Sequence, residues 1–275
     1  MTTAFVLGGG GKWGAVEVGM LQALDELGIR PDLVLGTSVG AFNGSVIADR
    51  PGPEGVERLT DLWIEIARSN VFQGGTLGRV KKAATLRPSL HETSELRALL
   101  ERVHAKDRMI EDLPIRFQCV AASIERASEH WFTKGSLIDA VLASSAVPAL
   151  LPPVEIEGEH FYDGGLVNSV PLTRAVDLGA RVVYVLQVGR IESPLRPPER
   201  LHEAGLIAFE IARRHRYTTT VQHLPEGIDL HLLPSGNAVS FDDSRQRKWR
   251  DVSSTHELIS GAYLASSQYL AALRS

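Results

Sequence analysis

The stretch Leu35-Gly36-Thr37-Ser38-Val39-Gly40 lies between an apolar run and a run with the composition of a helix. Its Gly-x-Ser-x-Gly spacing is typical of a sharp turn from a strand into a helix, with the serine exposed at the turn. Gly36 and Gly40 let the backbone turn tightly and leave room for a substrate beside Ser38. Small residues also gather in ordinary turns, so the pentapeptide alone supports a plain turn and a nucleophilic serine about equally.

The elements around this turn predict an α/β fold. A strand expected at residues 3–7 is followed by the glycine-rich loop 8–14 and then by a helix. A second strand, residues 33–35, leads through the serine turn into a second helix, residues 39–49. This strand–helix order predicts a parallel sheet with a right-handed crossover.

Further strands and helices follow from the apolar spacing of the remaining chain. The expected strands are 115–124, 130–132, 154–156, 160–162, 182–188 and 228–233. The expected helices are 94–103, 136–145, 171–179, 200–223 and 257–273. Ser136 is expected to cap the start of its helix, because a serine hydroxyl can accept a bond from the first turn.

Residues 50–112 are mostly helical and polar in pattern, with Pro and Gly breaks near 51–55, 74–78 and 88, which suggests an inserted helical cap. There is no internal repeat and no linker long enough to require a second unit. We therefore expect one domain over residues 1–275, in which 190–275 is the less diagnostic part.

Composition excludes several classes of protein. The 275 residues are 44% hydrophobic and 23% charged, which is typical of a globular chain with a sizeable core. The net charge of −4 argues against a nucleic-acid-binding protein, which would carry a basic surplus. Cys119 is the single cysteine, so no intrachain disulfide or cysteine metal cluster can form, and its apolar neighbours indicate a buried, inert thiol.

The N-terminus reaches the strand-like Ala4-Phe5-Val6-Leu7 at once, without the basic start of a signal peptide. No uncharged apolar run of 18 or more residues suggests a transmembrane helix. The expected location is the cytoplasm, with loose attachment to a membrane surface as the alternative.

Three glycine-bearing turns each follow an expected strand: loop 8–14, the turn at Ser38, and Asp163-Gly164-Gly165. Because ligands bind where the carboxyl ends of parallel strands meet, these turns can converge on one site. A serine needs a base to accept its proton, and Asp163 can do so directly or through a histidine. A glycine-rich loop that opens a helix supplies N–H donors for a developing oxyanion.

Two other classes of protein share part of this pattern. Gly9-x-Gly11-x-x-Gly14 fits a dinucleotide-binding loop, but the second strand lacks the acidic residue that should end it; Gly11-Lys12-Trp13 also fails the P-loop pattern. An ordinary α/β-hydrolase has more sheet before its serine, and it needs a histidine after the aspartate. Five histidines follow Asp163, and no motif marks any as a relay: His202, His215, His223, His231 and His256.

With these residues assembled, the chain resembles the patatin-like phospholipase family. The resemblance covers roughly residues 3–190 and rests on five segments in order. They are Gly9-Gly10-Gly11-Lys12-Trp13-Gly14, Gly36-Thr37-Ser38-Val39-Gly40, Ala143-Ser144-Ser145-Ala146-Val147-Pro148, Asp163-Gly164-Gly165 and Asn168-Ser169-Val170-Pro171. It implies a three-layer α/β/α sandwich with a mainly parallel central sheet, and hydrolysis of lipid acyl esters, such as those of phospholipids or lysophospholipids, without a cofactor or metal.

The resemblance also implies a role for each matching residue. Ser38 is the nucleophile of a Ser–Asp dyad, and Asp163 is the general base that later returns the proton. The backbone N–H groups of Gly10 and Gly11 form the oxyanion hole. The remaining motif glycines have a supporting role: Gly9, Gly14, Gly36, Gly40, Gly164 and Gly165. The runner-up is a non-catalytic lipid- or nucleotide-binding protein on the same scaffold.

One departure concerns Trp13, which stands where the family usually has Arg or Lys, while Lys12 comes one position earlier. We favour a packing role for Trp13 over a place in the lipid mouth. Ser144 and Ser145 are interpreted as helix-end residues near the site. Asn168 is expected to hydrogen-bond the loop that carries Asp163.

Two charged runs are interpreted as solvated surface. Arg213-Arg214-His215-Arg216 lies on the helix expected at 200–223. The basic residues around Trp249 suit either a solvated loop, which we favour, or contact with an anionic lipid surface. Asp242-Asp243 has no ligand spacing around it that would support a metal site.

Overall fold

The computed structural model describes residues 2–68, 93–148, 150–188, 195, 197–198, 201–222, 224–236 and 252–274. Its strands are β1 (Thr3–Leu7), β2 (Leu33–Gly36), β3 (Arg116–Ser123), β4 (Ser128–Phe132), β5 (Val154–Ile156), β6 (Glu159–Asp163), β7 (Val182–Leu186) and β8 (Asp229–Leu232). Its α-helices are α1 (Ala15–Glu26), α2 (Val39–Asp49), α3 (Pro53–Arg68), α5 (Ser94–Val103), α6 (Leu137–Ser144), α7 (Leu172–Asp177), α8 (Leu201–Gln222) and α9 (Val252–Ala272). Short 3-10 turns are η1 (Gly11–Gly14), η2 (Ile110–Asp112) and η3 (Gly164–Leu166).

The strands form one mixed sheet in the order β5-β6-β3-β2-β1-β7-β8, with β4 also paired to β3. The five strands from β3 to β8 run parallel, as the alternation of strands and helices predicts. Strands β4 and β6 both run antiparallel to β3, and β5 forms a hairpin with β6. The mainly parallel sheet therefore has an antiparallel end, which carries Asp163.

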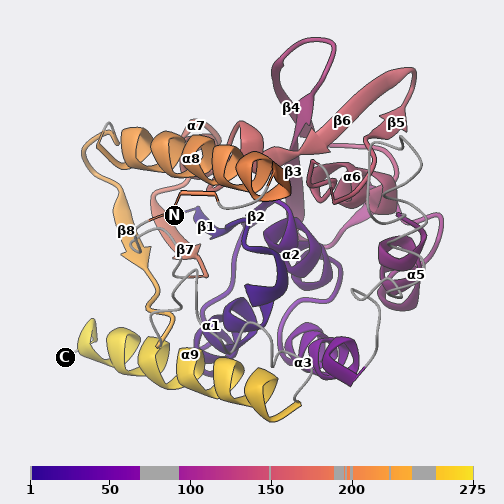
Figure 1. Cartoon of the computed structure of the whole chain (residues 1–275). Helices are drawn as coiled ribbons and strands as arrows, with labels where there is room; N and C mark the ends of the chain where they lie inside the picture. Colours follow the sequence, from indigo (N-terminus) through magenta and orange to yellow (C-terminus); the bar gives the residue numbers. More distant parts are fainter. Residues whose placement is uncertain are drawn as a thin grey trace.

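Side-chain alternation along the strands places helices on both faces of the sheet. In β1, Phe5 and Leu7 enter a core that includes residues of α1, α2, α3, α5, α6 and α9. Ala4 and Val6 point to the opposite face, where α7 and Tyr217 of α8 pack. Figure 1 shows α7 and α8 on one side of the sheet and α1, α3 and α9 on the other. The predicted three-layer α/β/α arrangement is confirmed.

The expected element boundaries agree with the structure to within a few residues, and Ser136 caps α6 by accepting the N–H of Asp139. The largest difference is at the C-terminal helix, since α9 begins at Val252 rather than at 257. Described parts of segment 190–275 also belong to the fold, because β8 extends the sheet and α9 packs along α1. Of the expected cap, the structure describes α3 and α5, while the breaks near 74–78 and 88 lie outside the described residues.

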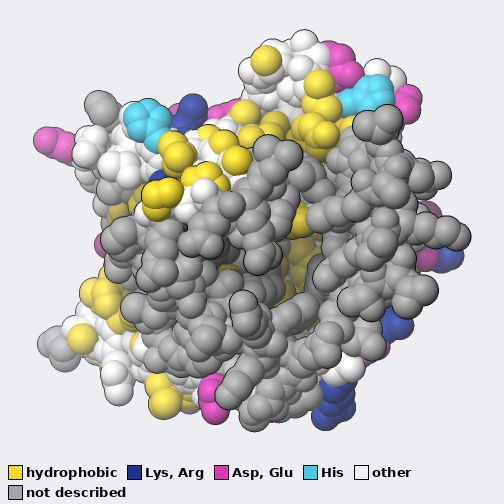
Figure 2. Space-filling view, viewed as in Figure 1, with side chains coloured by type: hydrophobic (Ala, Val, Ile, Leu, Met, Phe, Trp, Pro, Cys, Tyr) yellow, Lys and Arg dark blue, Asp and Glu magenta, His cyan; other side chains and the backbone are white. Residues whose placement is uncertain are grey.

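The described helices include none with both the length and the apolar character that a membrane crossing requires. Figure 2 shows hydrophobic side chains gathered where α8 approaches the ends of β4 and β6. Exposed large hydrophobic side chains include Ile211 of α8 and Ile124, which follows β3. Cys119 is fully buried in β3, and burial raises the pKa of its thiol, as expected of an inert cysteine.

Candidate active site

Ser38 occupies a strained turn between β2 and α2. Its φ of 56° and ψ of −123° lie in a region that non-glycine residues rarely adopt. Backbone bonds hold the turn, from the Thr37 N–H to the Leu7 carbonyl (3.2 Å), from the Gly40 N–H to the Thr37 carbonyl (2.9 Å) and from the Phe42 N–H to the Ser38 carbonyl (3.0 Å). The sharp turn predicted from Gly-x-Ser-x-Gly is thus present, and its backbone strain is a feature of nucleophile elbows.

The glycines beside Ser38 allow α2 to start directly against the strand ends. A Cβ on Gly40 would overlap the carbonyl group of Leu7 in β1, and a Cβ on Gly36 would lie 2.5 Å from the Cα of Ala41. Any side chain at either position would push the first turn of α2 away from the sheet. Gly36 and Gly40 therefore fix the position of Ser38 through close backbone packing.

The glycine-rich loop lies directly beside Ser38. A Cβ placed on Gly9 would be 3.6 Å from the Cβ of Ser38. The Gly8 and Gly9 N–H groups are used within the fold, on the carbonyls of Leu186 and Ser169 (both 2.9 Å). Within the described residues, the N–H groups of Gly10 and Gly11 have no acceptor.

The free N–H groups of Gly10 and Gly11 are those expected to bind an oxyanion. The N–H of Ser38 itself is not free, because it donates to Oγ of Ser144 (3.0 Å) at the end of α6. Ser144 therefore does more than end its helix, because its side chain holds the backbone of Ser38. No motif in the sequence marks this contact.

The far end of the loop is anchored by a buried network. Asn43 of α2 donates to the carbonyl of Gly14 (3.0 Å) and to Oε2 of Glu17 (2.8 Å), and it accepts from Nε1 of Trp63 (2.9 Å). Burial raises the pKa of Glu17 well above its ordinary range, although the bonds from Asn43 and Gly8 act against this. Burial thus favours the neutral form of Glu17, whose Oε1 has no hydrogen-bond partner among the described residues.

Asp163, the last residue of β6, is fully buried. Its Oδ1 accepts the Gly165 N–H (2.7 Å), and its Oδ2 has no partner with good hydrogen-bond geometry among the described residues. Burial raises the pKa of Asp163 to about 6, although the Ser38 hydroxyl, the Gly165 N–H and the charge of Arg213 act in the opposite direction. The Ser38 hydroxyl is thus close enough to act on this carboxyl, and such contacts commonly tighten when substrate binds.

The strand that carries Asp163 runs in a different direction from the one expected. The prediction placed Asp163 at the carboxyl end of a parallel strand, but β6 runs antiparallel to β3. In the register of β3, Gly36 pairs with Cys119 and Asp163 pairs with Ala121, two residues further on. The β5–β6 hairpin therefore returns Asp163 to the level just beyond β2, where the Ser38 turn begins.

The segment after Asp163 links the Asp163 loop to the turn that carries Ser38. The Asn168 N–H donates to the carbonyl of Gly164 (2.7 Å), and the Asn168 carbonyl accepts from Oγ1 of Thr37 (2.8 Å). Asn168 thus supports the Asp163 loop as expected, but through its backbone, while its side chain approaches Glu129. A Cβ on Gly164 would overlap the carbonyl of Val120, so this glycine lets the loop cross β3 closely.

The solvated-face interpretation of α8 is wrong for Arg213. His215 and Arg216 are exposed, but Arg213 is buried and pairs with Glu210 (Nε to Oε2, 2.7 Å). Its Nη1 donates to the carbonyl of Gly9 (3.2 Å). The sequence signal was a glutamate three residues before an arginine, which is equally common on exposed helices.

None of the histidine side chains described after Asp163 is placed as a relay. His215 and His256 are exposed, and His231 stacks on Tyr184 (centroids 4.7 Å apart). The side chains of His202 and His223 lie outside the described residues, as do Asp242-Asp243 and the basic residues around Trp249. Among the described side chains, Asp163 is the carboxyl whose pKa responds to the Ser38 hydroxyl.

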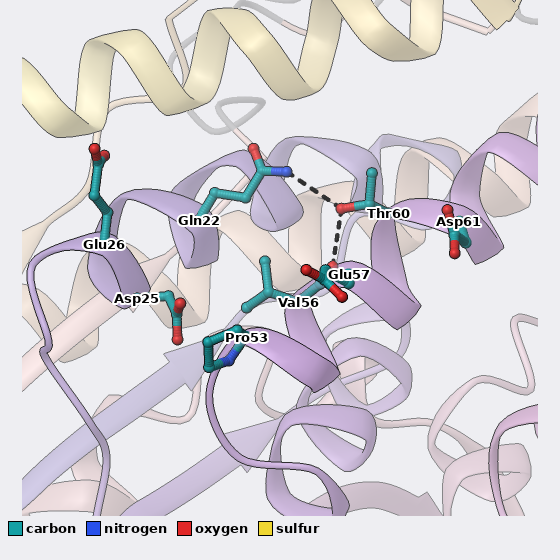
Figure 3. A pocket seen from close by; sticks show the side chains of 8 residues that line it. All are labelled: Gln22, Asp25, Glu26, Pro53, Val56, Glu57, Thr60 and Asp61. Atoms are coloured by element: carbon teal, nitrogen blue, oxygen red, sulfur yellow. Dashed lines mark hydrogen bonds between the residues drawn. The ribbon is translucent and has the colours of Figure 1, made fainter.

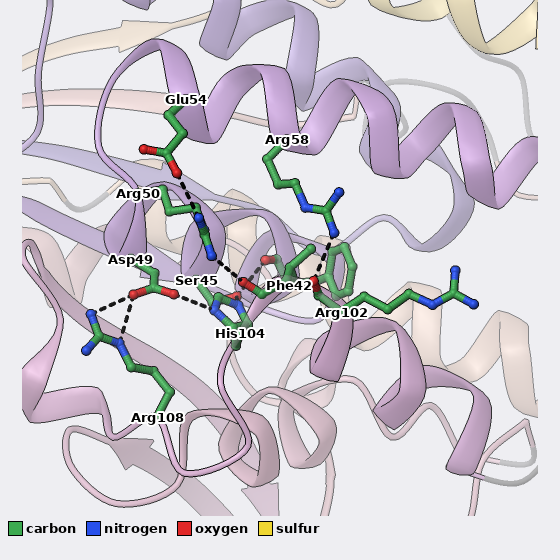
Figure 4. Close-up of polar contacts among 10 residues, drawn as sticks. Phe42, Ser45, Asp49, Arg50, Glu54, Arg58, Arg102, His104 and Arg108 are labelled. Atoms are coloured by element: carbon green, nitrogen blue, oxygen red, sulfur yellow. Dashed lines mark hydrogen bonds and ion pairs between the residues drawn. The ribbon is translucent and has the colours of Figure 1, made fainter.

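A Ser–His–Asp arrangement separate from Ser38 lies inside the fold, on α2 and the loop after α5 (Figure 4). Nε2 of His104 lies 3.0 Å from Oγ of Ser45, and Nδ1 lies 2.9 Å from Oδ2 of Asp49. However, the Ser45 hydroxyl also lies 2.7 Å from the carbonyl of Phe42 as a hydrogen-bond donor, so it has an internal acceptor other than His104. Ser45 is also fully buried, so this triad is structural.

Asp49 gives this structural triad its charge. Burial acts to raise the pKa of Asp49, but hydrogen bonds from His104 and Arg108, together with their charges, lower it overall. The resulting carboxylate joins α2 to the segment after α5. This network anchors the helix that carries Ser38 at its other end.

A cavity of about 520 Å³ opens between α1 and α3, away from Ser38 (Figure 3). Its lining includes four carboxylates, which are Asp25, Glu26, Glu57 and Asp61. It contains no serine or cysteine nucleophile, and its negative charge would repel an anionic lipid head group. This cavity is therefore not the ester-binding site.

Trp13 is 7% exposed and packs against Val188 and Leu258, which confirms the packing interpretation. The side chain of Lys12 lies outside the described residues. Position 13 thus brings no positive charge to the loop, and a cation that contacts the loop among the described side chains is Arg213 of α8.

Comparisons with known proteins show the family of this chain. The sequence model of the patatin-like phospholipase family matches residues 5–176, so the chain belongs to this family. "Lysophospholipase nte1" of Aspergillus terreus is 31% identical over 195 residues, which are 70% of this chain and 12% of that protein. "Patatin-like phospholipase domain-containing protein 7" of Rattus norvegicus is 32% identical over 188 residues, which are 68% of this chain and 13% of that protein. The chain thus spans about an eighth of the length of these curated relatives.

Among solved structures, the chain is similar in fold to VipD from Legionella pneumophila. The TM-score is 0.51 at 14% identity, and the match covers 98% of this chain and 67% of the other. At this identity the likeness concerns the fold alone.

Proposed function

We propose that this chain is a serine acyl hydrolase that cleaves carboxylic esters of lipids. The observation that carries the proposal is the strained Ser38 turn placed between a buried carboxyl and unused loop N–H groups. Backbone strain and an unsatisfied buried carboxyl oxygen both lower the stability of the fold. Binding alone does not require either feature, whereas catalysis by a serine and a carboxylate base does.

The acylation step uses all three parts of the site. Oγ of Ser38 attacks the ester carbonyl while Asp163 accepts the hydroxyl proton. The N–H groups of Gly10 and Gly11 stabilise the negative oxygen of the tetrahedral intermediate. Asp163 then gives the proton to the departing alcohol, which leaves an acyl group on Ser38.

The deacylation step repeats the sequence with water. Asp163 accepts a proton from the attacking water, and the same N–H groups stabilise the second intermediate. Collapse releases the fatty acid and returns the proton to Ser38. A pKa of about 6 suits both steps, because Asp163 is ionised at neutral pH yet is a stronger base than an exposed aspartate.

We propose phospholipids or lysophospholipids as the substrate class, since relatives of this chain are named lysophospholipase or phospholipase domain proteins. The hydrophobic side chains near α8 and the ends of β4 and β6 would favour contact with a lipid surface (Figure 2). The proposed place of action is the cytoplasm or the surface of a membrane facing it.

The test is hydrolysis of lysophospholipids, diacyl phospholipids and short-chain esters by the wild type and by two serine variants. Ser38→Ala should lose turnover. Ser45→Ala is the matched control, because it removes the serine hydroxyl of the buried Ser45–His104–Asp49 triad. This variant should remain active. Equal turnover in the wild type and Ser38→Ala protein would refute the proposed function, and release of acylated alcohol in place of fatty acid would redirect it to acyl transfer.

A further inference from the structure

A buried arginine of α8 lies behind the glycine-rich loop. The Arg213 side chain is 4% exposed, and its Nε and Nη2 atoms donate to the two oxygens of Glu210 (2.7 and 3.3 Å). The remaining Nη1 donates to the carbonyl of Gly9 (3.2 Å) and to Oγ of Ser169 (3.3 Å). The guanidinium group therefore donates with Nε, Nη1 and Nη2, to the buried carboxylate of Glu210 and to the segments that contain Gly9 and Ser169.

The bond to Gly9 sets the direction of the next N–H. A trans peptide is planar, so the carbonyl of Gly9 and the N–H of Gly10 point in opposite directions. Because Arg213 holds that carbonyl on the α8 side, the Gly10 N–H points away from α8. Within the described residues this N–H has no acceptor, although it lies in the loop that touches Ser38.

We propose that Arg213 is a positioning residue for the oxyanion hole. Its guanidinium fixes the peptide between Gly9 and Gly10 so that the Gly10 N–H faces the carbonyl oxygen of the bound ester. This inference rests on the proposed function of Ser38 as a nucleophile. It adds a residue more than 200 positions further along the chain that does not touch the substrate itself.

The bonding pattern explains why an arginine occupies this place. The loop is rich in glycine and would otherwise be free to rotate its peptides. The same Nη1 also holds Ser169, whose carbonyl accepts the Gly9 N–H (2.9 Å), so both ends of Gly9 are fixed from one point. Glu210 compensates the buried positive charge, and a charged donor on the carbonyl polarises the peptide and strengthens its N–H as a donor.

The test must separate positioning from folding, because removing one partner of a buried ion pair leaves the other charge uncompensated. The double variant Arg213→Met/Glu210→Gln removes both charges. Arg213→Lys keeps a single cation without the planar fork. Arg216→Gln is the matched control, since it removes one exposed positive charge from the same helix, where Arg216 pairs with Glu129 (2.7 Å).

Two readouts report on the oxyanion. The first is the division between kcat and KM on a soluble ester. The second is the inhibition constant of a trifluoromethyl ketone, which forms a tetrahedral oxyanion on the serine and so requires the same N–H groups. Circular dichroism and thermal melting confirm that each variant is folded.

In the folded double variant, kcat should fall about 10- to 100-fold, while KM should stay within about twofold of the wild-type value. The reason is that the negative oxygen forms in the transition state and is absent from the bound substrate. The inhibition constant should rise by a similar factor. Arg213→Lys should fall between the double variant and the wild type, and Arg216→Gln should match the wild type.

An unchanged kcat in the folded double variant would overturn the positioning role, as would a change in KM alone or an unchanged inhibition constant. These outcomes leave the proposed function intact as long as Ser38→Ala is inactive. Equal turnover by the wild type and Ser38→Ala would instead refute the proposed function, and the positioning role with it.

Discussion

Replacing Asp163 by Asn should abolish turnover and at the same time stabilise the folded protein at neutral pH. Asparagine has nearly the same shape and can still accept the Gly165 N–H through Oδ1, but it carries no charge to bury and cannot act as the base. The two effects therefore have one cause, the placement of an ionisable carboxyl in a fully buried site.

The magnitude follows from the raised pKa of Asp163. The folded protein holds this proton up to a pH of about 6, whereas the unfolded chain releases it near the ordinary value of 3.8. Between these pH values the folded state binds more protons, so the free energy of unfolding of the wild type falls as pH rises. At about 1.4 kcal/mol per pH unit, the full difference is about 3 kcal/mol above pH 6 and vanishes below about pH 4.

The assay is urea unfolding of wild type and Asp163→Asn, followed by tryptophan fluorescence at several pH values from 4 to 8. Other titrating groups, including Glu17, are common to both proteins, so the difference between their unfolding free energies isolates Asp163. The variant should gain stability relative to the wild type only as pH rises through this window. A difference that does not depend on pH, or a less stable variant at pH 8, would refute the reasoning.

Three further substitutions test other parts of the site. Gly40→Ala should lower the free energy of unfolding by about 1–3 kcal/mol and displace Ser38, because its methyl group would overlap the Leu7 carbonyl; thermal melting and turnover measure both effects. Ser144→Ala should leave the Ser38 N–H without its acceptor and reduce kcat about tenfold in folded protein, and unchanged kinetics would contradict the assigned contact. Ser45→Ala should lower the free energy of unfolding by about 1–3 kcal/mol, because the contact with His104 is lost, while kcat/KM should stay within about twofold of the wild-type value. An inactive but folded variant would mean that the internal triad has a catalytic role.

Local signals were sufficient for the part of the site that is built from adjacent residues. The Gly-x-Ser-x-Gly turn, the glycine-rich loop and the surrounding strands each have a short-range cause, either a close backbone approach or an alternating apolar pattern. The same holds for the two faces of the sheet, since the alternation of Ala4, Phe5, Val6 and Leu7 already assigns them.

The features that the sequence did not reveal all depend on tertiary contacts. The antiparallel approach of Asp163 depends on which edge of β3 the hairpin joins. The acceptor for the Ser38 N–H comes from the end of α6, and the cation on Gly9 comes from α8. An arginine on an amphipathic helix has the same sequence pattern whether it faces water or a buried carboxylate, so Arg213 could be assigned only after α8 was placed.

The central claim is that Ser38 is a nucleophile activated by Asp163. The most direct measurement is the rate of covalent labelling by a fluorophosphonate at pH 8, with the modified residue located by peptide mass spectrometry. We predict one adduct, on Ser38, formed quickly in the wild type and in Ser45→Ala, and very slowly in folded Asp163→Asn. Labelling at another residue, or equally fast labelling without Asp163, would contradict the account.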